Sequence, residues 1–294
     1  MGNKLLGRLT IALAYLSTSF FATSVHALDE AKLTAAVQTE EGALQARIGM
    51  VVVDAGTGAN WNYRGDERFP LNSTHKTFAC AALLAKVDQK ALALDQPVSI
   101  RKDLLVTYSP ITEKKLAPET MTLGELCHAA VSYSDNTAGN LVVEALGGPA
   151  AFTSYMRTIG DETTRLDRKE PELNEALPGD LRDTTTPNAI VGSLRKILLG
   201  DVLSASSRVE LTQWMLDDQV AGALLRASLP SDWKIADKTG AGGYGSRSIV
   251  AVIWPPAKPA LVVGIYITQT NASTSISNQA IARIGTVLKE AVGQ

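Results

Sequence analysis

Residues 248–267 read SIVAVIWPPAKPALVVGIYI, two runs rich in β-branched residues on either side of Pro255 and Pro256. β-Branched residues favour strands, whereas adjacent prolines interrupt a strand and favour a turn. We therefore expect a hairpin formed by residues 248–254 and 260–267. Residues 277–292 follow it and are expected to form a closing helix.

The N-terminal part of the chain predicts further elements of the same sheet. Residues 29–46 alternate apolar and charged positions at helical spacing, which predicts a helix. RIGMVVVD at residues 47–54 is typical of a buried strand. Gly56 and Gly58 indicate a turn toward a second strand near residues 61–63. Strands therefore come from both ends of the chain.

The middle of the chain, from about residue 73 to residue 226, shows helical patterning broken by loops. We expect an α/β plus all-α protein, in which an antiparallel sheet is flanked by helices and a helical domain is inserted. The expected α/β domain is discontinuous and comprises residues 28–64 and 227–294. The helical domain comprises residues 65–226.

One segment of the helical domain, residues 165–186, is irregular. It holds ten charged residues and two prolines, with little helical periodicity. A loop of this length inside a compact domain is uncommon and often functional.

The first 27 residues have the features of a secretory signal peptide. Lys4 and Arg8 precede an apolar stretch at residues 9–21, and Val25-His26-Ala27 is a small-x-small cleavage signature. The apolar core is shorter than the ~20 residues that span a bilayer. We expect a secreted, periplasmic protein with no membrane association after cleavage. The alternative is an N-terminal anchor that is left uncleaved.

Charge and histidine content argue against two classes of function. The chain has 28 basic and 30 acidic residues and no Lys/Arg run, so we expect no nucleic-acid partner. Of the three histidines, His26 lies in the signal, which leaves His75 and His128. Two histidines cannot assemble a zinc-ligand cluster, so we expect no metal and no cofactor and interpret both as structural.

Cys80 and Cys127 are the only cysteines. An even number in an exported protein favours a disulfide. Two buried free thiols are the alternative.

Ser73-Thr74-His75-Lys76 precedes the apolar run 78–84. A helix that begins near Ser73 would place Ser73 and Lys76 one turn apart on the same face, a nucleophile beside its base. The pattern alone is weak, because Ser-x-x-Lys recurs at Ser99, Ser193 and Ser231. A solvated helix face is the alternative for each copy.

Two further tripeptides, each present once, distinguish Ser73 from the other copies. Residues 134–136 are Ser-Asp-Asn, and residues 238–240 are Lys-Thr-Gly directly before a glycine-rich turn. Alone, the first could be a helix cap and the second the end of a strand. The three motifs together and in this order set Ser73 apart from the other copies.

With these three motifs the mature chain resembles the class A serine β-lactamases over essentially its whole length. The resemblance implies the serine β-lactamase/D,D-peptidase-like fold and hydrolysis of β-lactam antibiotics through an acyl-enzyme, which gives antibiotic resistance. Residues 170–174, Glu-Pro-Glu-Leu-Asn, match the family's loop with a catalytic Glu. Arg168 and Asp183 match the ion pair at the neck of that loop. Cys80 and Cys127 lie where many members have a disulfide.

The resemblance also implies roles for individual residues. The implied catalytic residues are Ser73, Lys76, Ser134 and Glu170, and the implied oxyanion hole is formed by the backbone N–H groups of Ser73 and Ala241. The implied substrate-binding residues are Tyr108, Asn136, Asn174, Lys238, Thr239, Gly240 and Arg247. Either Lys76, or Glu170 through a water, takes the proton of Ser73. Lys238 and Arg247 supply cations for the substrate carboxylate; an ordinary surface charge is the alternative for Arg247.

Two other functions share the three motifs. A penicillin-binding D,D-peptidase acts on peptidoglycan stem peptides, and a β-lactam sensor domain is acylated and then does not turn over. Both should lack the deacylating Glu, so residues 170–174 argue against them.

Residues 104–110 and 240–248 look like the carbenicillin-hydrolysing branch, although several of those enzymes have Arg in place of Lys238. We expect penicillin hydrolysis, including carboxypenicillins, with weaker turnover of early cephalosporins. Asn72 and Gly242 stand where class A carbapenemases place an additional disulfide, so carbapenem hydrolysis is not expected. Gly242 and Thr107 lack the substitutions associated with an extended cephalosporin spectrum. We also expect sensitivity to clavulanate-type inhibitors and a monomeric protein.

Overall fold

The structure is a computed structural model that describes residues 1–2 and 28–293. The predicted signal peptide lies outside these residues, apart from Met1 and Gly2. In the described part of the chain, no helix is both long and apolar enough to cross a membrane.

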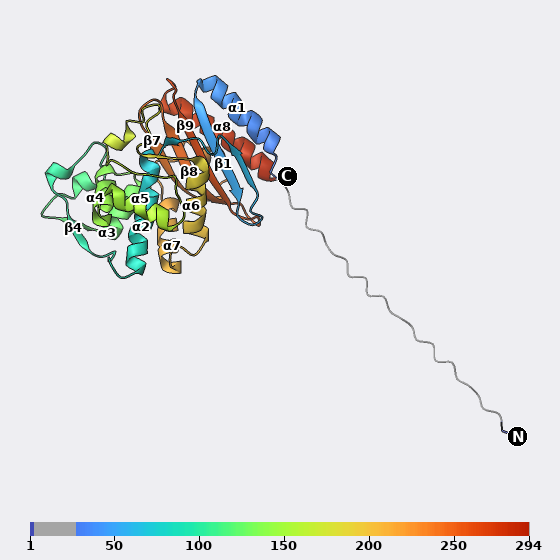
Figure 1. Cartoon of the computed structure of the whole chain (residues 1–294), viewed down its shortest axis with the longest axis horizontal. Helices are drawn as coiled ribbons and strands as arrows, with labels where there is room; N and C mark the ends of the chain where they lie inside the picture. Colours follow the sequence, from blue (N-terminus) through green and yellow to red (C-terminus); the bar gives the residue numbers. More distant parts are fainter. Residues whose placement is uncertain (3–27, 294) are drawn as a thin grey trace.

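A five-stranded antiparallel sheet forms the centre of the protein, with strand order β2-β1-β9-β8-β7 (Figure 1). Its strands are β1 (Arg47–Asp54), β2 (Asn60–Tyr63), β7 (Lys234–Ala241), β8 (Arg247–Trp254) and β9 (Leu261–Thr268). The predicted hairpin is confirmed as β8 and β9, which pair with Ile249 opposite Ile265. β1 pairs with β9 along its whole length, which joins the two ends of the chain in one sheet.

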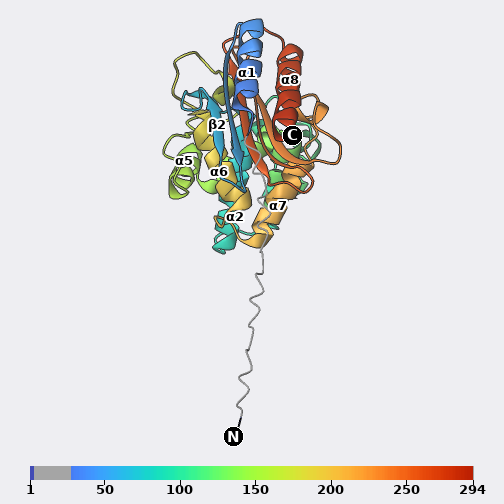
Figure 2. The ribbon, with the colours of Figure 1, turned by 90° about the vertical axis from the view of Figure 1, so that its right-hand side faces the viewer.

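Two helices cover one face of the sheet. α1 (Glu30–Leu44) and α8 (Thr274–Gly293) lie side by side on it (Figure 2). Alternate residues of a strand point to opposite faces. Ile48, Met50 and Val52 of β1 therefore pack in this layer, whereas Val51 and Val53 pack in the core on the other face. The predicted antiparallel sheet with flanking helices is confirmed.

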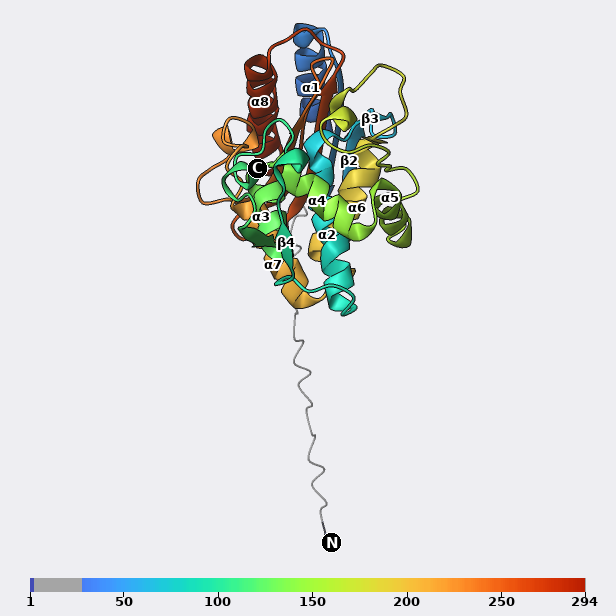
Figure 3. The same cartoon turned by 90° about the vertical axis from the view of Figure 1, so that its left-hand side faces the viewer.

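The other face is covered by the helices from the middle of the chain (Figure 3). α6 (Pro187–Leu199) packs directly against β1, β8 and β9. The remaining helices are α2 (His75–Asp88), α3 (Leu123–Ser132), α4 (Asn136–Leu146), α5 (Pro149–Thr158) and α7 (Ala205–Leu216). Short 3-10 turns are η1 (Asn72–Thr74), η2 (Lys102–Leu104), η3 (Thr112–Lys114), η4 (Glu172–Asn174) and η5 (Leu225–Ala227).

Two further sheets, each of two short strands, lie outside the five-stranded sheet. β3 (Phe69–Pro70) pairs with β6 (Thr184–Thr185), and β4 (Pro97–Ser99) pairs with β5 (Thr120–Thr122). The first pair joins the chain just before Ser73 to the end of the irregular loop. The loop that was predicted to be functional therefore closes beside the proposed nucleophile.

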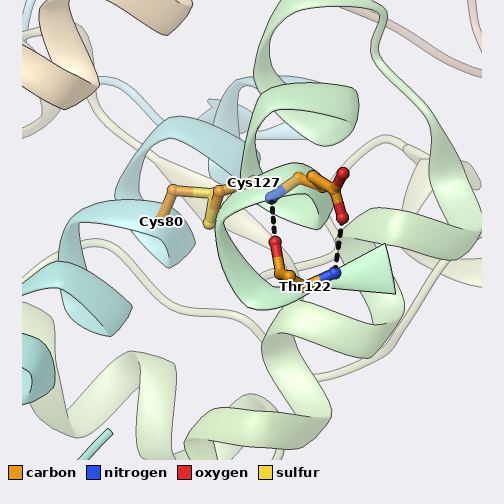
Figure 4. Close-up of a disulfide and its surroundings, with 4 residues drawn as sticks. Cys80, Thr122 and Cys127 are labelled. Atoms are coloured by element: carbon orange, nitrogen blue, oxygen red, sulfur yellow. Dashed lines mark hydrogen bonds between the residues drawn. A yellow bond between two sulfur atoms is a disulfide. The ribbon is translucent and has the colours of Figure 1, made fainter. Parts of the chain in front are cut away.

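Cys80 and Cys127 form a disulfide between α2 and α3 (Figure 4). α3 begins with a capping box, in which Thr122 Oγ1 accepts from Glu125 N and Glu125 Oε2 accepts from Thr122 N. A cross-link over 47 residues stabilises the fold by about 4 kcal/mol in the chain-entropy model. It holds the helix that follows Ser73 against the helix that precedes Ser134.

Candidate active site

Ser73 lies in the 3-10 turn η1, two residues before α2 begins. The predicted helix start near Ser73 is therefore confirmed, with a tighter first turn. Lys76 Nζ donates to Ser73 Oγ at 2.8 Å, and Ser73 Oγ donates to Glu170 Oε1 at 3.2 Å. Of the other Ser-x-x-Lys copies, Ser193 donates its hydroxyl to Asp161, and Ser99 and Ser231 are exposed. Ser73 thus differs from them by its contacts and not by its motif.

Lys76 is fully buried. Its ammonium donates to the backbone oxygen of Ser134 at 2.9 Å and to Asn136 Oδ1 at 2.6 Å, and it lies 3.0 Å from Glu170 Oε1. Burial lowers the pKa of Lys76, because desolvation disfavours the cation more than the nearby Glu170 carboxylate favours it. A lysine with a lowered pKa loses its proton more readily, so more of it is present as the neutral amine that can accept a proton.

Residues 134–136 serve as a helix cap and also place two side chains at the site. Asp135 is the N-cap of α4 and accepts from Ala138 N at 2.8 Å. Ser134 precedes it in a left-handed conformation, with φ 59°. Asn136 donates from Nδ2 to the carbonyl of Thr107 at 2.8 Å. The tripeptide 134–136 therefore both caps α4 and places Ser134 and Asn136 at the site.

Glu170 lies in the irregular loop, which is held at its neck by Arg168 and Asp183. Arg168 Nε lies 2.6 Å from Asp183 Oδ2, as the resemblance implied. The side-chain amide of Asn140 in α4 forms two hydrogen bonds with the Glu170 backbone. Its Oδ1 accepts from Glu170 N and its Nδ2 donates to Glu170 O, each at 2.8 Å. Asn174 Nδ2 donates to Glu170 Oε2. The loop thus holds a buried carboxylate against the Ser73 hydroxyl.

The charge of Glu170 follows from its neighbours. Burial raises the pKa of this carboxyl group, but the Lys76 cation and the hydrogen bonds from Lys76 and Asn174 outweigh burial, so the pKa is lowered overall. Glu170 is therefore ionised at neutral pH. An ionised carboxylate can accept a proton from a bound water.

A cleft of about 390 Å³ opens above Ser73. Its lining residues are Ser73, Tyr108, Ser134, Asn136, Asn174, Val220, Thr239, Gly240, Ala241, Arg247 and Thr274. The cleft brings together the residues predicted to bind substrate, except Lys238, which is fully buried behind it. β7 is the edge strand of the sheet, so backbone groups of Thr239, Gly240 and Ala241 on its outer side are not covered by a further strand.

Two basic side chains lie at or next to the cleft: Arg247 lines it, and Lys238 is buried beside Thr239. Lys238 Nζ donates to the carbonyl of Thr239 at 3.1 Å. Arg247 is only 7% exposed and donates to Gly240 O at 3.0 Å and to Asn278 Oδ1 at 2.7 Å. The alternative reading of Arg247 as an exposed surface charge is therefore wrong. Burial lowers the pKa of Lys238 to about 7 and that of Arg247 to about 10.

Sequence reasoning missed several residues at the site. Val220 and Thr274 line the cleft, and Asn140 and Asn278 hold Glu170 and Arg247 in place. Each belongs to no motif, and only the folded chain brings it to the site. No pattern in the sequence could have identified them.

Neither predicted structural histidine lines the cleft. His75 is buried, and its Nδ1 lies 2.8 Å from the carbonyl of Asn72. Burial lowers the pKa of His75 to about 4, which leaves it neutral at physiological pH. The ring of His128 packs edge-on against Tyr133. Among the residues that the structure describes, no three His, Cys, Asp or Glu side chains could hold a metal ion.

Comparisons with known proteins agree with one another. Residues 31–292 match the model of a family described as the beta-lactamase enzyme family. The β-lactamase AER-1 of Aeromonas hydrophila is 73% identical over 290 residues, which covers 99% of this chain and 95% of that protein. The β-lactamase CARB-4 of Pseudomonas aeruginosa is 50% identical over 245 residues, covering 83% of this chain and 85% of that protein. A solved structure of an ancestral class A β-lactamase has a TM-score of 0.87 and 49% identity, and it covers 88% of this chain and 99% of that chain.

Proposed function

Because this chain belongs to the class A β-lactamases, we propose that it opens the β-lactam ring through an acyl-enzyme on Ser73, which a water activated by Glu170 then releases. The observation that carries this proposal is the group of buried contacts among Ser73, Lys76 and Glu170. A nucleophile, a lysine that can act as a base once it is neutral, and an ionised carboxylate meet there. Such a site can both form and hydrolyse an ester.

In the acylation step, the Ser73 hydroxyl oxygen forms a bond to the lactam carbonyl carbon. The hydroxyl proton passes to Lys76, or through a water to Glu170, and both groups lie within 3.2 Å of Ser73 Oγ. The negative carbonyl oxygen is stabilised by the backbone N–H groups of Ser73 and Ala241. The ring C–N bond then breaks as the Ser134 hydroxyl gives its proton to the lactam nitrogen, and Ser134 regains a proton from the group that accepted the one from Ser73.

In the deacylation step, Glu170 takes a proton from a water held between Glu170 and Asn174. The water oxygen attacks the ester carbon, and the bond to Ser73 Oγ breaks as that oxygen regains a proton. This step distinguishes a β-lactamase from a protein that is merely trapped by penicillin. The contact from Asn174 to Glu170 supports it, because one residue that positions the other can also position their shared water.

The cleft suggests how a penicillin is oriented. Thr239 and Arg247 line the cleft, and the buried Lys238 adds a second positive charge next to Thr239, which together suit the carboxylate next to the ring. Asn136 and the β7 backbone at Gly240 suit the side-chain amide, and Tyr108 forms a wall. We propose penicillins, including carboxypenicillins, as the preferred substrates, with weaker turnover of early cephalosporins.

Further expectations accompany this function. A Ser73 acyl-enzyme should also be trapped by clavulanate-type inhibitors. We propose that the mature enzyme acts as a monomer in the periplasm. We also propose the division into a discontinuous α/β domain and a helical domain, with the cleft between η1 and the edge strand β7.

A kinetic assay tests the function directly. We expect purified protein to hydrolyse a molar excess of benzylpenicillin and of a chromogenic cephalosporin over many turnovers, because Glu170 is placed to release the acyl group. A single stoichiometric burst followed by no further product would contradict the hydrolase and favour a sensor or a D,D-peptidase. The Ser73→Ala variant controls for contaminating activity.

The buried cation at Lys238 predicts a pH dependence. Its ordinary lysine pKa is lowered to about 7 in the free protein, so the positive charge is present below that pH and is lost as pH rises through it. We expect kcat/KM for a penicillin to fall above about pH 7, by up to about tenfold per pH unit, because kcat/KM reports the free enzyme. The bound carboxylate favours the cation, so the alkaline limb of kcat should lie at higher pH.

Lys238→Arg is the matched variant for this experiment, because a guanidinium keeps its charge. The alkaline limb of kcat/KM should then move to higher pH. If the alkaline limb of kcat/KM stays at the same pH in Lys238→Arg, it reports the titration of another group, such as Lys76. A profile that is flat to about pH 9 in the unmodified protein would show that Lys238 keeps its proton.

A further inference from the structure

Asn72, the residue before Ser73, is almost completely buried, with 1% exposure, and has φ 45°. Asparagine tolerates this left-handed conformation better than most residues. Its Nδ2 donates to Asn174 Oδ1 at 3.2 Å, and Asn174 Nδ2 donates to Glu170 Oε2. A chain of two amides therefore leads from the residue beside the nucleophile to the carboxylate.

The direction of this chain follows from the charge at its end. Ionised Glu170 can only accept hydrogen bonds, so Asn174 has to present its NH₂ group to it. The Asn174 oxygen then faces Asn72, and Asn72 has to present its own NH₂ group. Each amide thus has one orientation that satisfies all partners. Asn72 adds a second hydrogen bond that holds Asn174 in the orientation in which its amide serves Glu170.

The surroundings of Asn72 indicate that its amide does more than fill space. A Cβ atom at Gly242 would lie 2.2 Å from Asn72 Nδ2, and one at Gly240 would lie 2.9 Å from Asn72 Cβ. The amide therefore lies against the part of β7, and the turn after it, that borders the cleft. Asn72 Oδ1 is buried and has no hydrogen-bond partner among the described residues. Burying an unpaired polar atom is unfavourable, and an apolar side chain would avoid it.

We propose that Asn72 is a positioning residue for deacylation, which acts by holding the Asn174 amide and thereby the water that Glu170 activates. This inference rests on the proposed role of Glu170. Loss of the Asn72 donor removes one of the two hydrogen bonds that hold the Asn174 side chain, so the amide is free to shift relative to Glu170. The water is then misplaced, whereas the contacts of Ser73 with Lys76 are unchanged. Deacylation should therefore slow more than acylation.

Asn72→Asp tests this with the least change of shape. Aspartate has the size of asparagine and tolerates a positive φ, but its carboxylate cannot donate to Asn174. We expect kcat and KM for benzylpenicillin to fall together by about tenfold or more, with kcat/KM changed by less than about threefold, because deacylation becomes limiting. Intact-mass measurement should show a Ser73 adduct at steady state. Asn271→Asp makes the same change at an exposed position and should have no effect.

Asn72→Gly is the second variant. Glycine adopts a positive φ without strain and removes the amide, so it keeps the experiment informative if the aspartate variant folds poorly. Active sites are counted in each preparation by the acylation burst. A fall in kcat/KM equal to that in kcat, with KM unchanged, would overturn the proposal, since a structural defect lowers both parameters in proportion.

A double-mutant cycle with Asn174→Ala tests the route through Asn174. We expect Asn72→Asp to cause no further slowing of deacylation once Asn174 has been replaced. Multiplicative effects would show that Asn72 acts independently and would overturn the inference. If Asn174→Ala and Glu170→Ala also fail to accumulate an adduct, the proposed function itself is wrong. If they accumulate one and Asn72→Asp does not, only the role of Asn72 is wrong.

Discussion

Glu170→Ala is expected to convert the enzyme into one that is acylated by a penicillin and stays acylated. The change removes the carboxylate that lies 3.2 Å from Ser73 Oγ and accepts from Asn174, so no group remains to activate the deacylating water. We expect the deacylation rate constant to fall by about 10³-fold, within the range for loss of a general base. Intact-mass measurement after mixing with benzylpenicillin should show one adduct, located on Ser73 by peptide mapping.

Glu172→Ala is the matched control, because Glu172 lies two residues away in the same loop and is exposed. It should keep the turnover of the unmodified protein. Unchanged turnover in Glu170→Ala would contradict the proposed mechanism. The rate at which the adduct forms gives a second result. Fast acylation without Glu170 would show that Lys76 is the base that accepts the Ser73 proton.

Lys76→Met is expected to have a comparably large effect on the other half of the reaction. Methionine matches the length of the lysine stem but removes the ammonium that contacts Ser73, the Ser134 backbone and Asn136. We expect the acylation rate constant, and with it kcat/KM, to fall by about 10³-fold. Stopped-flow measurement of a single turnover with excess enzyme reports this constant.

The same change should also alter Glu170. Burial alone raises the pKa of Glu170, and the Lys76 cation is the largest effect that lowers it. Without Lys76, the pKa of Glu170 should rise, so residual activity should depend more strongly on pH in the acid range. Lys90→Met is the control, since Lys90 is exposed in the turn two residues beyond the end of the same helix. Acylation at the rate of the unmodified protein would show that Lys76 is neither the base nor needed to orient Ser73.

Much of the architecture could be predicted because it depends on local patterns. Consecutive β-branched residues at 47–54 and 248–267 indicate strands whatever the rest of the chain does, and both regions form strands. The order of strands in the sheet is a different matter. β1 and β9 pair across more than two hundred residues of sequence, and no local pattern specifies such a partner.

The sequence by itself determined which reactive groups the chain carries and, through three motifs and residues 170–174, the family it belongs to. Only the tertiary structure decided how these groups act on one another. Ser73 and Glu170 are 97 positions apart but form a hydrogen bond, and Lys76 has a lowered pKa because the folded chain buries it completely. The role of Asn72 could likewise not be predicted from the sequence, since its amide binds Asn174 only because the fold brings η4 next to it. The physical reason is that desolvation, Coulomb interactions and hydrogen bonds depend on distance in space, which sequence spacing does not specify beyond a single helical turn.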